Sequence, residues 1–258
     1  MAQQYTSSQL LAHRGYRACY PENTLASIRA AVEAGAQIIE FDVQLTRDLV
    51  PVVVHDVNLK RTSGVDMSVP ISNAETVCNV SVHEPDRFGD RFEPSYMATL
   101  QAVIDYLKDF PEVRVFVEPK RESIGIYKPS VMLDQMDPIL APIRDRCVVV
   151  SFSLDCVYEC ARRNQIGEGG QFGWVLRHWD DSSRALAGIL KPDVLSASYQ
   201  LIPKTKLALW SGPWSWYVYG ADDIETANEL AELGVNIIGT DDIGSLLEAF
   251  DKSQQKTA

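Results

Sequence analysis

The sequence predicts an α/β fold and, within that class, a TIM (β/α)8 barrel. Short apolar runs of β type alternate with amphipathic helical stretches along nearly the whole chain. The length of 258 residues is close to the ~250 residues typical of such barrels. Hydrophobic residues make up 46% of the chain and charged residues 23%, which is enough apolar material for a core of normal density. A doubly wound sheet is the alternative fold with the same alternation.

The individual elements follow from this alternation and from helix-capping signals. Asn23 or Thr24 can cap the first helix, and Gly35 closes it. Asp222 and Asp223 stand at the start of a later helix, where negative charge suits the helix dipole. The expected strands are 9–13, 37–43, 50–55, 113–118, 147–151, 171–176, 193–196, 214–219 and 236–239. The expected helices are 24–34, 97–109, 129–143, 154–163, 181–189, 222–233 and 242–252.

One connection is too short for a parallel crossover. The segment EFDVQLTRDLVPVVVHD contains two β-type runs with about four turn residues between them, whereas a crossover needs roughly a dozen. The two runs therefore form an antiparallel hairpin, which explains why nine strands are expected instead of eight. A turn centred on residues 47–48 places Glu40 opposite His55 and Asp42 opposite Val53.

Glu40, Asp42 and His55 are predicted to share one face of this hairpin. Side chains alternate along a strand, and directly opposed residues lie on the same side. Carboxylates buried among apolar strands must be paired or must bind a cation. Oxygen ligands of this kind favour hard ions, which predicts Mg²⁺ or Ca²⁺. The alternative is that these groups lie on the solvated face of an exposed hairpin.

Two further strand ends carry polar motifs. His13-Arg14-Gly15 follows an apolar run, so His13 lies at the carboxyl end of a strand, where reactive groups of α/β barrels gather. Arg14 offers a guanidinium to phosphate or carboxylate, although a capping histidine and a surface arginine are the alternative. Glu118 and Lys120 share a face at the end of VRVFVEPK. They could bind a metal and a phosphoryl oxygen, respectively, or simply pair with each other.

Residues 56–96 contain no clean strand–helix unit. They carry Pro70, Pro85 and Pro94 among other turn-forming residues. A stretch of this length inside a compact domain is usually an insertion with a small structure of its own. We therefore predict one domain over residues 1–258, with a small insertion at about 56–96 beside the mouth of the barrel.

Composition excludes several kinds of partner. The formal net charge of −11 argues against non-specific binding to nucleic acid, which needs an excess of Lys and Arg. No run approaches the roughly 18 apolar residues of a membrane span, and the first residues lack the basic and apolar regions of a signal peptide. The five cysteines form no CxxC pair. These features predict a cytoplasmic protein with reduced thiols.

The polar motifs, taken in order, resemble those of the glycerophosphodiester phosphodiesterase family. The matching segments are His13-Arg14-Gly15, Pro21-Glu22-Asn23-Thr24, Glu40-Phe41-Asp42-Val43, Pro51-Val52-Val53-Val54-His55-Asp56 and Glu118-Pro119-Lys120. Ser151-Phe152, Trp216 and the stretch from Gly234 to Asp241 also match family landmarks. The resemblance runs from about residue 8 to residue 250, which is essentially the whole chain.

The resemblance implies a TIM-barrel hydrolase that uses one divalent cation, Mg²⁺ or Ca²⁺. Its substrates would be small glycerophosphodiesters, which it converts to sn-glycerol 3-phosphate and an alcohol. By analogy the glycerol 2-hydroxyl attacks first, and water then opens a cyclic phosphate. The implied metal ligands are Glu40, Asp42 and Glu118; the implied general acid–base residues are His13 and His55, in either order; Arg14 and Lys120 match phosphate-contacting positions. A barrel phospholipase acting on lipid phosphodiesters and a non-catalytic phosphate-binding barrel are the alternatives.

The departures from the family pattern concern mainly the substrate end of the pocket. Leu49 stands where a glycine usually follows the hairpin aspartate, and Pro119 replaces an aliphatic residue. Trp216 belongs to an aromatic cluster that is expected either to pack in the core or to form a wall for an alcohol or choline-like group, and it is the candidate substrate-binding aromatic residue. His83 and His178 are expected to be surface or locally hydrogen-bonded residues.

Overall fold

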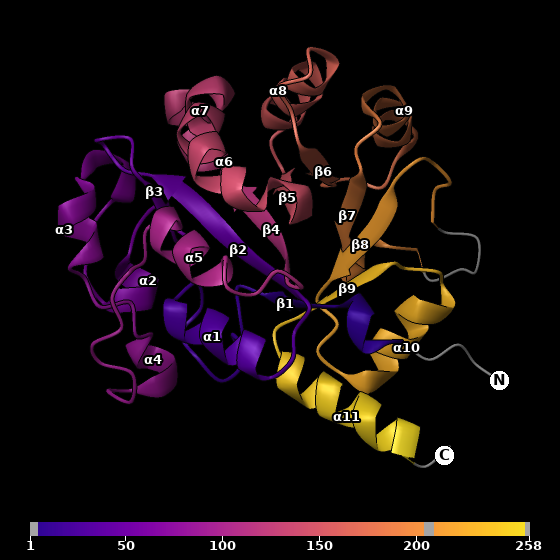
Figure 1. Ribbon diagram of the computed structural model, residues 1–258, viewed down its shortest axis with the longest axis horizontal. Helices are drawn as coiled ribbons and strands as arrows, with labels where there is room; N and C mark the ends of the chain where they lie inside the picture. The colour runs from indigo at the N-terminus through magenta and orange to yellow at the C-terminus, as the bar shows by residue number, and fades with distance from the viewer. Residues whose placement is uncertain (1–4, 204–208, 256–258) are drawn as a thin grey trace.

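Eight parallel strands form a closed ring in the computed structural model, which describes residues 5–203 and 209–255 (Figure 1). Around the ring the order is β1, β2, β4, β5, β6, β7, β8 and β9, and the ring closes because β1 pairs with both β2 and β9. The closed ring confirms the TIM barrel and excludes the doubly wound alternative, whose sheet would stay open. The ring strands are β1 (Leu10–His13), β2 (Ile38–Leu45), β4 (Arg114–Pro119), β5 (Cys147–Ser151), β6 (Gln171–Val175), β7 (Val194–Ser198), β8 (Ser215–Tyr219) and β9 (Ile237–Thr240).

The ninth strand, β3 (Pro51–Val53), pairs antiparallel with β2 outside the ring, so the predicted hairpin is confirmed. Its predicted register is wrong by one residue, because Val53 lies opposite Val43 instead of Asp42. The loop is longer by one residue than expected, and Leu49 within it adopts the left-handed conformation with φ +61°. Glu40 is therefore not paired with His55, and the chain leaves the β2 ladder after Val53.

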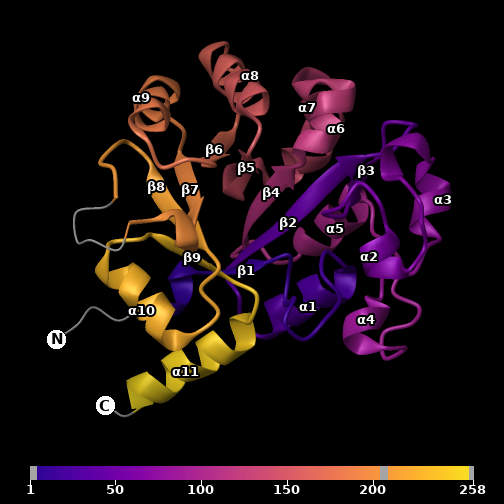
Figure 2. The same ribbon diagram turned by 180° about the vertical axis from the view of Figure 1, so that it is seen from behind.

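Helices cover the outside of the ring. Helix α1 (Leu25–Glu33) begins at the predicted cap, where the Thr24 hydroxyl accepts a hydrogen bond from the Ser27 amide at 3.1 Å. Helix α10 (Ile224–Glu232) is capped in the same way by Asp223. The remaining outer helices are α5 (Leu100–Leu107), α6 (Arg121–Tyr127), α7 (Pro129–Leu140), α8 (Leu154–Gln165), α9 (Asp181–Leu190) and α11 (Ile243–Gln255). Of these, α6 is the one that the sequence pattern did not predict, and α11 packs against β1 (Figure 2).

The segment between β3 and α5 lies to one side of the barrel (Figure 1). It contains the short helices α2 (Lys60–Ser63), α3 (Ala74–Cys78) and α4 (Pro85–Phe88). It also has a small apolar cluster of its own, which consists of Val52, Val54, Leu59, Val69, Val77, Val82 and Met97. No helix in the described ranges is long and apolar enough to cross a membrane.

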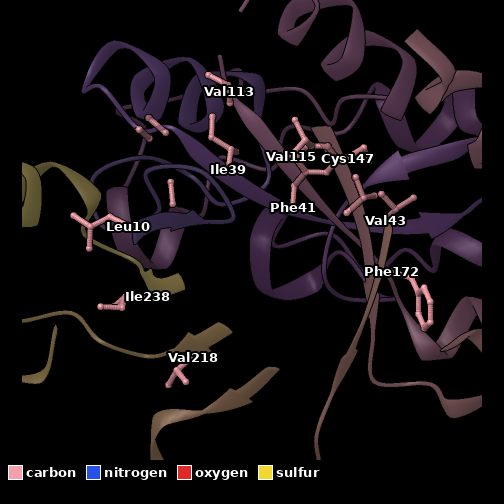
Figure 3. Packing of buried hydrophobic residues seen from close by; sticks show 14 of the residues in the cluster. Leu10, Ile39, Phe41, Val43, Val113, Val115, Cys147, Phe172, Val218 and Ile238 are labelled. Atoms are coloured by element: carbon pink, nitrogen blue, oxygen red, sulfur yellow. The ribbon is translucent and has the colours of Figure 1, made fainter. Parts of the chain in front are cut away.

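Alternation along the strands separates two apolar layers. Ile38 packs with Phe116 and Tyr217 in a cluster inside the ring, whereas the neighbouring Ile39 packs outward under the helices. Figure 3 shows part of this outer layer. Because side chains alternate, Glu40 and Asp42 on β2 continue the inward row that begins at Ile38. The fold thus directs these carboxylates toward the axis of the barrel.

Candidate active site

The carboxyl ends of β1, β2 and β4 bring the predicted polar residues together at one mouth of the barrel. The parallel registers place His13 beside Glu40 and place Asp42 beside Glu118. A pocket of about 230 Å³ opens there. It is lined by His13, Arg14, Glu40, His55, Glu118, Lys120, Phe152, Val175, Ser196, Tyr217 and Tyr219. This is the end of a TIM barrel at which catalytic residues are found.

Glu40, Asp42 and Glu118 each offer a carboxylate oxygen within 4.8 Å of the other two. All three residues are buried, and the Oε1 atom of Glu40 is buried with no hydrogen-bond partner in the described part of the chain. A buried oxygen without a partner is costly unless another group binds it. The donor set consists of carboxylate oxygens, which suit a hard divalent ion such as Mg²⁺ or Ca²⁺. These residues therefore fit the predicted metal site.

The pKa values of the three acids are shifted in different directions. Burial raises the pKa of Glu40 well above its usual range, and the charges of Asp42 and Glu118 raise it further. Burial also raises the pKa of Glu118, although the Lys120 ammonium opposes this shift. Burial would raise the pKa of Asp42 as well, but the charges of Lys120 and Arg14 outweigh it and lower that pKa. An added cation would favour the ionised form of all three groups.

Two cationic side chains contact this cluster. The Nε atom of Arg14 lies 3.1 Å from Oδ2 of Asp42, and the Arg14 amide donates to Oε2 of Glu40 at 3.0 Å. The Lys120 ammonium donates to Oδ1 of Asp42 at 3.1 Å and to Oε1 of Glu118 at 2.5 Å. The pairing of Glu118 with Lys120 that the sequence left open is thus present, but Lys120 also reaches the carboxylate of a neighbouring strand.

The chain folds this way locally because it turns sharply after β1. Arg14 and Gly15 both adopt positive φ, at +58° and +75°. A Cβ atom on Gly15 would come within 2.8 Å of backbone atoms of Ser27, so the turn packs directly on α1 and requires glycine. Asn23, also at φ +58°, fixes the next carboxylate, because its side-chain amide donates to Asp42 and its carbonyl accepts from the Asp42 amide.

His13 is held by a carboxylate from the far end of the chain. Its Nδ1 atom lies 2.8 Å from Oδ1 of Asp241, and its ring stacks on Tyr219 with 6.0 Å between the ring centroids. Arg17 binds the other oxygen of Asp241 at 2.5 Å. Burial would raise the pKa of Asp241, but its bonds with His13 and Arg17 lower it. This arrangement leaves Nε2 of His13 directed toward Glu40, at 3.9 Å from Oε2.

His55, which also lines the pocket, has an equivalent arrangement. Its Nδ1 atom lies 2.6 Å from Oδ1 of Asp56, and the Nε atom of Arg61 binds the second oxygen of Asp56 at 2.7 Å. The bond to His55 lowers the pKa of Asp56. His55 lines the pocket even though the hairpin register differs from the prediction, because the chain beyond β3 carries it there.

Glu22 connects the two histidine–aspartate pairs. Its buried carboxylate binds Arg17 at 2.9 Å, Arg61 at 2.6 Å and Arg14 at 3.0 Å. Burial would raise the pKa of Glu22, but its bonds with these arginines lower it. Glu22 therefore lies behind both histidines and, through Arg14, one residue away from Asp42. Arg14 and Arg17 are close to Glu22 in sequence, whereas Arg61 is 39 positions away, so spacing alone does not indicate this link.

Trp216 does not face the pocket, so its predicted contact with substrate is not supported. It stands on the opposite face of β8 from Tyr217 and Tyr219, which do line the pocket. Its indole packs on Trp179 with 5.3 Å between centroids, and its Nε1 atom donates to the Trp210 carbonyl at 3.0 Å. The core-packing alternative is therefore the correct one. The alternation of side chains along β8 could have indicated both assignments.

The remaining histidines match the expectation. His83 is buried beside Ser81, whose hydroxyl lies 2.9 Å from Nδ1 of the imidazole. His178 is exposed and lines a hollow next to the candidate active site. Neither residue lines the pocket that contains His13 and His55.

A closed (β/α)8 barrel with two histidine–aspartate pairs, buried acids and two cations at its mouth is suited to the hydrolysis of phosphoric diesters. The profile described as "Glycerophosphoryl diester phosphodiesterase family" matches residues 13–245. Because this match spans most of the chain, the protein belongs to that family.

Two curated relatives match nearly end to end. A glycerophosphodiester phosphodiesterase from Caldanaerobacter subterraneus is 30% identical over 250 residues, covering 94% of this chain and 98% of the relative. A protein named probable glycerophosphodiester phosphodiesterase 1 from Mycobacterium tuberculosis is 28% identical over 241 residues, covering 90% of this chain and 88% of the relative.

Two solved structures show the same fold. An Oleispira antarctica phosphodiesterase, solved in complex with the product sn-glycerol-3-phosphate, aligns with a TM-score of 0.81 at 19% identity, covering 94% of this chain and 96% of that one. A glycerophosphodiester phosphodiesterase from Agrobacterium tumefaciens aligns with a TM-score of 0.74 at 22% identity, covering 93% and 99%.

Proposed function

We propose that this protein hydrolyses glycerophosphodiesters to sn-glycerol 3-phosphate and an alcohol, with a divalent cation and with His13 and His55 as general acid and base. The observation that carries the proposal is the placement of both histidines, each bonded to an aspartate, on the pocket that also contains Glu40 and Glu118. The names of the curated relatives and the product bound in the Oleispira antarctica structure support this substrate class.

Each histidine has one ring nitrogen engaged and the other available. Asp241 and Asp56 accept from Nδ1, so Nε2 can exchange a proton with substrate. One imidazole would take the proton from the attacking hydroxyl group. The other would donate a proton to the oxygen of the departing alcohol as the P–O bond breaks. When the attacking group is the glycerol 2-hydroxyl, this step releases the alcohol and leaves a cyclic phosphate. Water would then open the ring: the imidazole that gave its proton takes one from the water, and the imidazole that took a proton gives it to the glycerol oxygen. This second half yields sn-glycerol 3-phosphate and returns both histidines to their starting states.

The charged side chains would stabilise the phosphoryl group. Glu40, Asp42 and Glu118 would hold the cation, which supplies positive charge to the non-bridging phosphate oxygens when it is bound. Arg14 and Lys120 line the same pocket and would contact those oxygens. Such contacts accelerate the reaction to the extent that they strengthen as negative charge gathers in the transition state. We further propose a cytoplasmic location, since the five cysteines are free.

Hydrolysis of glycerophosphocholine, glycerophosphoethanolamine and glycerophosphoglycerol, with and without a chelator, tests this proposal. We expect turnover that is lost with the chelator and restored by Mg²⁺ or Ca²⁺. His13→Ala and His55→Ala should each lose at least ~100-fold in rate. Near wild-type turnover in either variant would remove that histidine from the mechanism, and activity that survives complete removal of divalent ions would contradict the metal role. Binding without turnover of any diester would support the non-catalytic barrel, and turnover of lipid diesters alone would support the phospholipase.

A further inference from the structure

A second hollow, of about 490 Å³, adjoins the candidate active site. It lies beyond the carboxyl ends of β5 and β6, between the starts of α8 and α9. Phe152, which follows β5, lines both this hollow and the pocket that contains His13 and His55. Arg177, which follows β6, lines the hollow and also the space that leads to His55 and Glu118. The hollow and the pocket therefore adjoin each other at Phe152.

The hollow lies where the alcohol portion of a bound diester would extend, on the far side of the scissile bond from the glycerol. The pocket at the centre of the barrel has a volume of about 230 Å³ and contains both histidines, so the phosphate must lie there. The group on the far side of the scissile bond has to extend outward from the phosphate. The larger hollow, reached past His55, offers that room. Its lining includes the apolar side chains of Trp174, Leu154 and Leu186.

Arginines outnumber acids in the lining of the hollow, with Arg121 and Arg177 against Asp180, in a chain whose net charge is −11. Arg177 is exposed, and it makes no ion pair or hydrogen bond with any residue in the described ranges. Three acids line these spaces: Asp180 accepts from the Ser183 amide at 2.7 Å, Glu122 pairs with Arg121 at 2.8 Å, and Glu118 accepts from Lys120 at 2.5 Å. Of the charged groups that line this wall, the Arg177 guanidinium is thus the one left without a partner among the described residues.

We propose that this hollow is the subsite for the departing alcohol, and that Arg177 makes it select an alcohol that carries a phosphate of its own. The proposal rests on the glycerophosphodiesterase activity proposed above and names its preferred substrates. A guanidinium matches the geometry of phosphate oxygens and can bind them through two hydrogen bonds. Choline and ethanolamine carry positive charge, which Arg177 repels, so the same wall disfavours them.

Two substrates that share one alcohol ring separate the effect of the alcohol's charge on kcat/KM from the effect of its ring structure. Glycerophosphoinositol and glycerophosphoinositol 4-phosphate share one ring and differ by one phosphate. We expect kcat/KM to be about 10-fold higher for the phosphorylated substrate at low salt, mainly through a lower KM. This preference should shrink as ionic strength rises, because Arg177 is exposed and its charge is screened. Equal kcat/KM for the two substrates, or a preference for glycerophosphocholine, would overturn the proposal.

Arg177→Gln removes the charge, and Arg184→Gln on α9 is the matched control, because Arg184 is also exposed but does not line the hollow. Arg177→Gln should abolish the preference for the phosphorylated substrate and leave turnover of glycerophosphoinositol within about 2-fold of wild type. Arg184→Gln should leave both unchanged. Equal losses on both substrates in Arg177→Gln would contradict selection by charge.

Calorimetric binding of inositol 4-phosphate and of inositol separates this proposal from the catalytic one. Inositol 4-phosphate is the alcohol that would depart, so its binding needs no turnover. We expect it to bind the wild-type protein more tightly than inositol and to lose this advantage in Arg177→Gln. If no diester is hydrolysed but this binding difference is observed, the proposed activity fails and the phosphate subsite stands. If diesters are hydrolysed but the binding difference is absent, the subsite fails alone.

Discussion

The Nδ1 atom of His13 lies 2.8 Å from Oδ1 of Asp241, a residue 228 positions away along the chain. This contact fixes the orientation of the imidazole and favours the tautomer in which Nε2 is free to accept a proton. Asp241→Asn would favour the opposite tautomer. We therefore expect kcat to fall by about 10- to 100-fold with little change in KM.

Steady-state kinetics on glycerophosphoglycerol would measure this effect. Asp242→Asn is the matched control, because the Asp242 carboxylate caps the Ser245 amide and does not contact either histidine. Its kcat should stay near that of wild type. Unchanged kcat in Asp241→Asn would show that the contact does not serve catalysis.

Glu22 should contribute to the stability of the fold in a pH-dependent manner. The pKa of Glu22 is lower in the folded protein than the ~4.3 of an unfolded chain, so its ionised form stabilises the fold above that pH. This stabilisation is lost as the pH falls through the folded pKa. We expect Glu22→Gln to lower the free energy of unfolding by about 2–4 kcal/mol at pH 7 and to flatten its decline below pH ~4.

Thermal unfolding between pH 3 and pH 7 would compare the two proteins. Glu232→Gln on α10 is the control, because Glu232 is exposed. It should follow the wild-type curve. If Glu22→Gln declined below pH 4 as steeply as wild type, Glu22 would not be the source of that dependence.

Divalent ions should stabilise the folded protein through the three-carboxylate cluster. A ligand present at 100 times its Kd adds about 2.7 kcal/mol to the free energy of unfolding. We expect Mg²⁺ or Ca²⁺ to raise Tm in the chelator-treated wild type. Glu40→Gln should abolish this rise, because it replaces the oxygen that has no partner in the structure.

A second group of possible ligands provides the control for that experiment. His83, Asp90 and Glu93 also come within 4.8 Å of one another, and Asp90 and Glu93 are exposed. Glu93→Gln should retain the full metal-dependent rise in Tm. A rise that is lost in Glu93→Gln and kept in Glu40→Gln would move the stabilising ion away from the barrel mouth.

Trp216 should serve stability and not substrate binding. Trp216→Phe removes the hydrogen bond to the Trp210 carbonyl and part of the packing on Trp179. We expect the free energy of unfolding in urea to fall by about 1–3 kcal/mol. The KM for glycerophosphocholine should stay within about 2-fold of wild type. A large rise in KM at unchanged stability would restore the role in substrate binding that the sequence suggested.

Gly15 and Gly35 provide a comparison of backbone strain alone with strain plus a steric clash. Both adopt positive φ, but a Cβ atom at Gly35 meets nothing within 4 Å, whereas one at Gly15 meets the backbone of Ser27. Gly35→Ala should cost about 1 kcal/mol. Gly15→Ala should cost more, about 2–4 kcal/mol. Urea titrations would measure both, and equal costs would contradict the close packing of this turn on α1.

Most of the fold could be predicted because parallel strands that are buried on both faces consist of consecutive apolar residues, which can be recognised in the sequence. Local turn geometry could not be predicted as well. The β2–β3 register depends on Leu49, which adopts a left-handed conformation that leucine rarely takes. Helix α6 escaped prediction because it is short and begins directly after β4. In both places the tertiary structure decides what the local pattern leaves open.

The inward-facing acids of the site were predictable because side chains alternate between the two faces of a strand. Glu40 and Asp42 share a strand face, and the parallel pairing of β2 with β4 brings Glu118 beside them. The supporting residues were not predictable from spacing, because the contacts of Asp241 and Glu22 join segments distant in sequence. The contact of Asp241 with His13 also needs the pairing of β1 with β9 that closes the ring.

The pairing of β1 with β9 determines when the contact between His13 and Asp241 can form as the protein folds. His13 ends the first strand and Asp241 follows the last, so the seam where the two ends of the sheet join lies between them. A chain that had assembled every other neighbouring pair of strands would still lack the aspartate behind this imidazole. Full turnover during refolding would thus report the joining of β1 with β9, which signals from secondary structure alone would not separate from the other strand pairings.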